Sequence, residues 1–231
     1  MAKKTKSPPS LTVVVTCGVL TALLGALLGI ISLATQSVFE LKEPLPPERQ
    51  EAGMVYFVKG SPSSSARWRA LRSQILAGTP GTIKFDEGDL NSWANSMLVL
   101  SSPNRGEEGE SEAVPGLFGL KVNVTGVNFR MEGDELQVAA YLEFPALASG
   151  KRFTYQARGS FDSGWGGLKF QPDEGTLGRA EIVSIPFLGS ALNKKLIGLF
   201  TQSPEWGALS EAWGKVASVE IAEGQATLTL N

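Results

Sequence analysis

The longest apolar run of the chain lies near its N-terminus. Residues 11–33 read LTVVVTCGVLTALLGALLGIISL and contain no charged side chain. A helix rises about 1.5 Å per residue, so a run of this length spans roughly 35 Å, enough for the hydrocarbon core of a bilayer. The pattern therefore predicts a transmembrane anchor over residues 11–34, with the membrane as the first partner of the chain.

Charges around this run predict its orientation. Lys3, Lys4 and Lys6 precede it, whereas residues 40–49 carry no excess of basic side chains. The positive-inside rule then places residues 1–10 in the cytoplasm as a short tail and the C-terminal domain outside, in the periplasm or at the cell surface. A cleaved signal peptide is the competing interpretation, because Ser32-Leu33-Ala34 resembles a cleavage site. The run exceeds the usual 7–15 apolar residues of such signals, which favours a retained anchor.

Small residues recur along one side of the predicted anchor. Gly18 and Ala22, and likewise Gly25 and Gly29, are four residues apart. Such spacing lets a second transmembrane helix approach closely. The alternative is that Gly and Ala are simply common in membrane helices, so an oligomer based on this pattern stays a hypothesis.

Prolines and charges separate the anchor from a longer region. Residues 35–52 include Pro44, Pro46 and Pro47, which predicts a partly extended linker that holds the domain off the membrane. Residues 53–231 suffice for one domain with a single core. Within them, residues 101–116 combine Pro, Gly, Ser and Glu without apolar periodicity, and we expect a mobile acidic loop there.

The spacing of apolar positions in this domain changes along the chain. Helical spacing predicts helices over residues 66–76 and 87–98, the second with Asp86 as its N-cap. From residue 117 the apolar positions alternate, with a phase shift at Gly126 that is typical of a bulge. Turns are predicted at residues 132–134, 172–175 and 223–224. Strands are predicted over residues 82–85, 117–131, 136–144, 152–161, 165–170, 176–185, 216–221 and 226–230.

A second apolar run, residues 187–200, reads FLGSALNKKLIGLF, and a short helix with Trp206 and Trp213 follows it. Its apolar residues cover more than a narrow stripe of a helix. They could line a groove beside the sheet or close on the sheet as a dry core, and the sequence leaves both open. The predicted ligand-binding residues are Phe187, Leu188, Leu192, Leu196 and Phe200 of this run, with Phe153 and Tyr155 of the neighbouring strand.

These elements together predict an α+β fold: a single N-terminal transmembrane helix, then one domain with a curved antiparallel β-sheet packed against amphipathic or apolar helices.

Composition excludes most familiar active sites. The chain has no His and a single Cys, Cys17, so it can form no His-containing triad, no Cys-based zinc site and no intramolecular disulfide. We find no nucleotide-binding or hydrolase motif, and the acidic residues fall mostly at predicted turns, where capping explains them. We therefore expect no catalytic residues, metal or cofactor.

Net charge argues against nucleic acid as a partner. Beyond Lys3, Lys4 and Lys6, the chain carries 18 basic side chains against 23 acidic ones. It has no basic stripe interleaved with aromatic residues.

Two segments resemble a known family. After the anchor and linker, residues 83–93 read IKFDEGDLNSW, and residues 178–186 read GRAEIVSIP before the second apolar run. This order resembles the YpmS-like family of bacterial membrane-anchored extracytoplasmic proteins. The resemblance implies an antiparallel sheet wrapped against long apolar helices, akin to lipid-binding tubular domains, and a role at the cell envelope. The acidic insertion at 101–116 and the Arg-rich helix over 66–76 depart from the family pattern.

These observations lead to two hypotheses. The first is an envelope protein whose outer domain binds a lipid-like or amphipathic ligand. The alternative is a non-catalytic scaffold or accessory subunit of a cell-envelope complex, with a protein partner. An accessible apolar pocket would favour the first, and close packing would favour the second.

Overall fold

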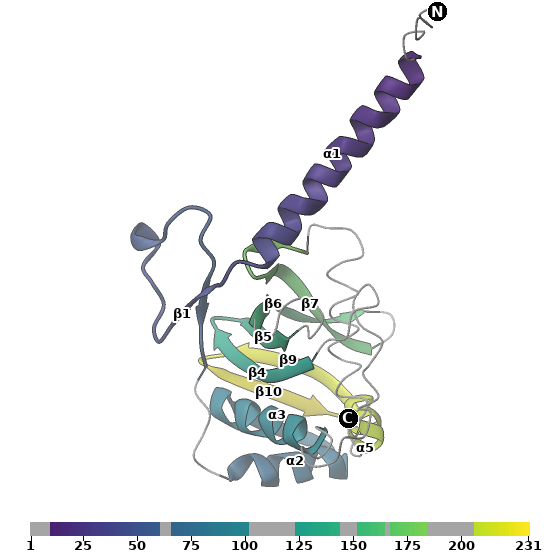
Figure 1. Cartoon of the computed structure of the whole chain (residues 1–231). Helices are drawn as coiled ribbons and strands as arrows, with labels where there is room; N and C mark the ends of the chain where they lie inside the picture. The colour runs from purple at the N-terminus through teal and green to yellow at the C-terminus, as the bar shows by residue number, and fades with distance from the viewer. Residues whose placement is uncertain (1–9, 61–65, 102–122, 144–151, 165–166, 184–205) are drawn as a thin grey trace, which may run out of the picture.

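The computed structural model describes residues 10–60, 66–101, 123–143, 152–164, 167–183 and 206–231. Its first element is the helix α1, Leu11–Ala34, which Ser10 caps and which projects away from the rest of the chain (Figure 1). This is the one helix in the described part that is long and apolar enough to cross a membrane. A single N-terminal apolar helix of this kind fits a membrane anchor.

Two antiparallel sheets form the domain. Strands β4 (Asn123–Glu132), β5 (Glu135–Glu143), β6 (Arg152–Gly164), β7 (Gly167–Leu177) and β8 (Ala180–Glu181) follow one another in a five-stranded meander. A three-stranded sheet has the order β3-β10-β9, with bounds Gly81–Asp86, Gln225–Leu230 and Val216–Ala222. The helices in the described part of the domain are α2 (Arg67–Ala77), α3 (Glu87–Ser101) and α5 (Trp206–Trp213). The predicted α+β class is confirmed.

Several local predictions are also confirmed. The register of β4 against β5 shifts between Val124 and Gly126, as expected for a bulge. Strand β4 turns into β5 at Gly133-Asp134, and β9 turns into β10 at Glu223-Gly224. The backbone N–H of Asp89 donates to Asp86 Oδ1 at 2.7 Å, so Asp86 caps α3 as predicted.

The predicted turn at residues 172–175 is wrong. Strand β7 continues through this segment and stays paired with β6. Arg158 faces Glu174 and Gly159 faces Pro172, so Asp173 is an extra residue in a bulge. Pro172 has no N–H to donate, and a bulge tolerates such a residue where a regular ladder would not. Turn-forming residues therefore interrupt the register here without ending the strand.

Part of the segment predicted as a linker belongs to a short ribbon, whose second strand lies beyond residue 52. Strand β1 (Phe39–Leu41) pairs in parallel with β2 (Tyr56–Val58), and a 3₁₀ turn, Pro47–Arg49, lies between them. Phe57 is fully buried against Ala139 and Tyr141 of β5. These two residues lie on the opposite face of the strand from Leu136 and Val138. The ribbon thus covers part of the second face of the five-stranded sheet. Parallel strands of three residues have too short a pattern to be predicted from periodicity.

Side chains of both sheets meet in the main core. Ile83 and Phe85 of β3, Met131 of β4 and Leu136 of β5 share one cluster. A second cluster joins β5, β6 and β7, and Ile30 and Ala34 of α1 pack against it. Helix α1 leaves one end of the domain, and α2 lies at the opposite end (Figure 1).

Candidate ligand cavity

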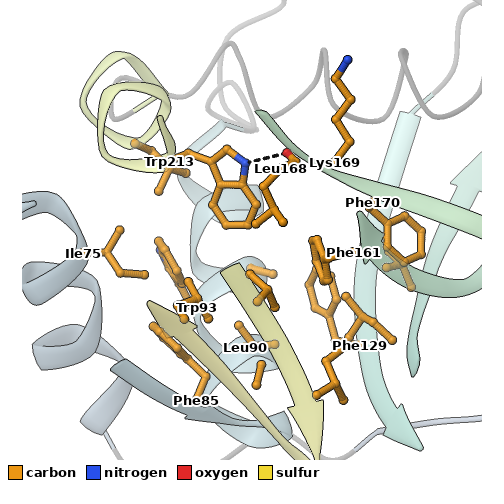
Figure 2. A pocket seen from close by; sticks show the side chains of 18 of the residues that line it. Ile75, Phe85, Leu90, Trp93, Phe129, Phe161, Leu168, Lys169, Phe170 and Trp213 are labelled. Carbon is orange, nitrogen blue, oxygen red and sulfur yellow. Dashed lines mark hydrogen bonds between the residues drawn. The ribbon is translucent and has the colours of Figure 1, made fainter. Parts of the chain in front are cut away.

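A large apolar cavity lies between the two sheets. It has a volume of about 650 Å³ and is bounded by α3, α5 and strands of both sheets (Figure 2). Its lining side chains are overwhelmingly aliphatic or aromatic. They include Ile75, Phe85, Leu90, Trp93, Ala94, Met97, Phe129, Leu136, Val138, Tyr155, Ala157, Phe161, Leu168, Phe170, Trp206, Leu209, Trp213, Val219, Ile221, Ala226 and Leu228.

Helix α3 supplies one wall through its apolar stripe. Leu90, Trp93, Ala94 and Met97 follow the i, i+3, i+4, i+7 spacing of one helix face, and all four line the cavity. The sequence predicts this face as buried. Ala94 and Met97 are buried, whereas Leu90 and Trp93 are partly exposed. The Trp93 ring stacks on Phe85 of β3 at 5.8 Å between ring centroids, which fixes the helix on the three-stranded sheet.

Aromatic contacts join the wall of β6 and β7 to α5. Phe161 and Phe170 are cross-strand partners whose ring centroids are 5.7 Å apart, and Phe161 lies 6.2 Å from the Trp213 ring. The indole Nε1 of Trp213 donates to the carbonyl of Leu168 at 3.3 Å (Figure 2). Helix α5 is thereby held over the start of β7.

Little charge reaches this cavity. Tyr155 and Lys169 are the titratable members of the described lining, and the Lys169 side chain points away from the aromatic residues in Figure 2. Burial raises the pKa of Tyr155 to about 12, so its phenol is neutral at physiological pH. No group of three or more His, Cys, Asp or Glu side chains among the described residues is arranged to hold a metal ion. The arrangement suits retention of an apolar molecule.

The residues predicted to bind a ligand divide into three groups. Tyr155 lines the cavity. Phe153 is instead buried beside Leu142 and Ile182 in the second cluster. The other five, in residues 187–200, lie outside the described residues, as do residues 102–116 of the predicted acidic loop.

The small residues predicted to pack between membrane helices lie on the projecting part of α1. Gly18, Ala22, Gly25 and Gly29 are exposed there. A Cβ at any of the three glycines would have no described atom within 4 Å beyond its own helix and neighbours. Their role in helix packing stays a prediction.

The sequence predicted most of the elements around the cavity, but not that they surround one common space. The apolar face of α3 and the hairpin β9–β10 were predicted separately. They come together because β10 pairs with β3, which joins residues 81–86 to residues 225–230. No local pattern carries this long-range pairing.

The polar residues at the start of α3 form contacts that hold the helix in place. Arg67 Nη1 lies 3.2 Å from Asp86 Oδ2 and 3.3 Å from Asp89 Oδ2, which joins the starts of α2 and α3. Glu87 Oε2 accepts the backbone N–H of Met131 at 3.1 Å. Asn91 Oδ1 accepts the N–H of Phe129 at 2.6 Å, and its Nδ2 donates to the carbonyl of the same residue at 2.8 Å. Glu87 and Asn91 thus attach α3 to the edge strand β4, and α3 forms one wall of the cavity.

Comparisons with known proteins leave the family open. The sequence matches no protein-family model, and no curated protein is significantly similar to it. The resemblance to the YpmS-like family therefore stays a prediction.

Proposed function

We propose that the protein is a single-pass membrane protein whose outer domain binds a lipid-like or amphipathic ligand. The observation that carries this proposal is the apolar cavity of about 650 Å³ between the two sheets. Ligand pockets in proteins measure about 300–1,000 Å³ and are mostly apolar. The size and the lining of this cavity fit that class.

The lining supports an apolar occupant. The walls of this pocket of about 650 Å³ are almost wholly apolar, and burying apolar surface against them is favourable by roughly 25 cal/mol per Å². Water gains little in such a space, because it needs two to four polar partners. An alkyl chain gains contacts with every wall.

The lining also supports binding rather than catalysis. The phenol of Tyr155 loses its proton only far above neutral pH, so Tyr155 is a poor proton donor at pH 7. Its hydroxyl group offers polarity without charge, which suits a hydrocarbon chain better than an ionised group. In this proposal the domain is a binding module, and no residue of the cavity is assigned a catalytic role.

The membrane part of the proposal rests on α1 and the charges before it. Residues 1–10 lie in the cytoplasm and the domain lies on the extracytoplasmic side, as the lysines before the helix indicate. The last turn of α1 supports a retained anchor, because Ala34 packs on the domain and Leu33 accepts a hydrogen bond from Arg179. Cleavage after Ala34 would remove both contacts. The intact mass of the protein from membranes should therefore include residues 1–34.

Mass spectrometry of extracted lipid tests the ligand. The full chain is purified from membranes, moved into a short-chain detergent without added lipid, and extracted with solvent. We expect about one lipid per chain. Val219→Trp should reduce this amount about tenfold, because Val219 lines the cavity and the larger indole group would occupy part of the space that a ligand needs.

Ser218→Trp is the matched control. Ser218 is the neighbour of Val219 in β9, is exposed, and points to the opposite face of the strand. This variant should retain the lipid. Absence of stoichiometric lipid from the unaltered protein, or equal loss in both variants, would contradict the proposal and favour a scaffold or accessory subunit that binds a protein partner.

A further inference from the structure

The membrane helix is joined directly to the domain at the turn between β7 and β8. The backbone N–H of Arg179 in this turn donates to the carbonyl of Leu33 at 3.0 Å. Gly178 lies so close that a Cβ there would be 2.3 Å from the carbonyl oxygen of Ala34. Ile30 and Ala34 also pack against the core cluster that contains Leu177. The end of α1 is therefore part of the folded domain.

This junction fixes the depth of the turn relative to the membrane. Helix α1 has 24 residues and is about 36 Å long, whereas a hydrocarbon core is about 30 Å thick. Its contacts with the domain begin at Ile30, about one helical turn before its end. The turn at Gly178-Arg179 therefore lies where the acyl chains meet the headgroups.

Two side chains beside this junction have the character of a membrane interface. Phe39 is 46% exposed, and it is the only exposed large hydrophobic residue outside α1 in the described part of the chain. The Arg179 guanidinium lies 5.4 Å from the centre of the Phe39 ring, and its Nε donates to the carbonyl of Ser37 at 3.2 Å. Among the described residues Arg179 has no carboxylate partner, so its two terminal nitrogens are available to a phosphate.

We propose that Phe39 and Arg179 form a membrane-contact surface that binds the headgroup region of an anionic phospholipid bilayer. Phe39 enters the boundary of the acyl chains, and Arg179 donates to lipid phosphate groups. Arginine and aromatic side chains at the end of a membrane helix favour this depth. The surface is continuous with the anchor, and it is independent of any ligand in the cavity. It holds the domain in one orientation on the bilayer.

Spin labelling tests the depth of Phe39. The full chain carries Cys17→Ser, and either Phe39→Cys or Gln74→Cys receives the label in nanodiscs that contain 30% anionic phospholipid. Gln74 is exposed on α2, at the end of the domain opposite α1 (Figure 1). We expect the label at Phe39 to be more accessible to oxygen than to a water-soluble nickel chelate, and the label at Gln74 to show the reverse. Equal chelate accessibility at both sites, or spin–spin coupling at Phe39 that identifies a second copy as its cover, would overturn the proposal.

Lipid preference tests Arg179. One basic residue near an anionic surface contributes about 1 kcal/mol, so Arg179→Gln should reduce the preference for anionic over neutral lipid about fivefold in native mass spectrometry of the full chain. Arg179→Lys keeps the charge and should keep most of this preference. Arg69→Gln, at an exposed arginine of α2, should change nothing. An unchanged preference in Arg179→Gln, or an equal loss in Arg179→Lys, would show that Arg179 only positions the junction.

Discussion

At the scale of single residues, two buried asparagines act as substitutes for neighbouring strands. Asn91 of α3 forms two hydrogen bonds with the backbone of Phe129 at the edge of β4. Asn128 of the same strand forms two with the backbone of Gly60, at 2.8 and 2.9 Å. An amide side chain carries one donor group and one acceptor, as a peptide group does. The edge of β4 is thereby paired at Phe129 without another strand.

Asn91→Leu should therefore destabilise the domain far more than its size change suggests. Leucine leaves the N–H and C=O of Phe129 without partners, and we expect the free energy of unfolding to fall by about 2–4 kcal/mol. Asn95→Ala is the control, because Asn95 Nδ2 donates only to a carbonyl of its own helix at 2.8 Å. Urea unfolding of the full chain in detergent, followed by tryptophan fluorescence, measures both. Equal midpoints for the two variants would contradict this role.

Asp89 gives stability a dependence on pH. Its side chain is fully buried, and burial raises its pKa above the ordinary value of an aspartic acid, with a further rise from Asp86 and a partial opposing effect of Arg67. A carboxyl group whose pKa is higher in the folded state binds more protons there than in the unfolded state, so stability falls as pH rises from the unfolded pKa through the folded one.

Asp89→Asn should remove this fall. We expect the urea midpoint of the variant to exceed that of the unaltered protein more at pH 7 than at pH 4. A difference that is constant from pH 4 to pH 7 would mean that Asp89 does not titrate in the folded protein as its burial implies.

At the scale of elements, the sequence predicted the features that local interactions determine, but not those that depend on long-range pairing. Helix α3 and the hairpin β9–β10 were predicted because Asp86 and Glu223-Gly224 mark their ends locally. The pairing of β3 with β10 was not, since neither strand contains a signal for the other. For the same reason the apolar faces were predicted, but not the cavity that they enclose. The bulge at Asp173 shows the limit of turn signals, because a paired strand absorbs them.

Trp213 makes two of the contacts that position helix α5. Trp213 contributes both its ring contact with Phe161 and its hydrogen bond to Leu168. Trp213→Phe keeps an aromatic ring but loses the donor, and we expect a loss of about 1–2 kcal/mol of stability together with faster amide exchange in residues 206–213. Trp206→Phe, at the other end of α5, is the comparison. Similar exchange in both variants would show that the hydrogen bond does not hold the helix.

At the scale of the whole molecule, strands β6 and β7 connect the cavity to helix α1. Leu168 and Phe170 near the start of β7 line the cavity, whereas Leu177 at its end belongs to the cluster on which Ile30 and Ala34 pack. Tyr155, the cross-strand partner of Leu177, lies in both the cavity lining and that cluster. One continuous pair of strands thus joins the two regions, and the orientation of the cavity relative to α1 follows from how α1 meets the domain.

Gly178→Ala tests this connection. Gly178 has φ +57°, and a Cβ there would meet the carbonyl oxygens of Ala34 at 2.3 Å and Gln36 at 2.7 Å. The substitution should separate α1 from the turn, so amide exchange should rise at residues 33–37 and 178–180 while the three-stranded sheet stays protected. Gly53→Ala is a matched control: Gly53 has φ +76° but no described atom within 4 Å of its Cβ position, so it has the same backbone strain without the contact. If both variants raised exchange only around their own position and to the same extent, the close contact would contribute nothing, and this turn would not hold α1 on the domain.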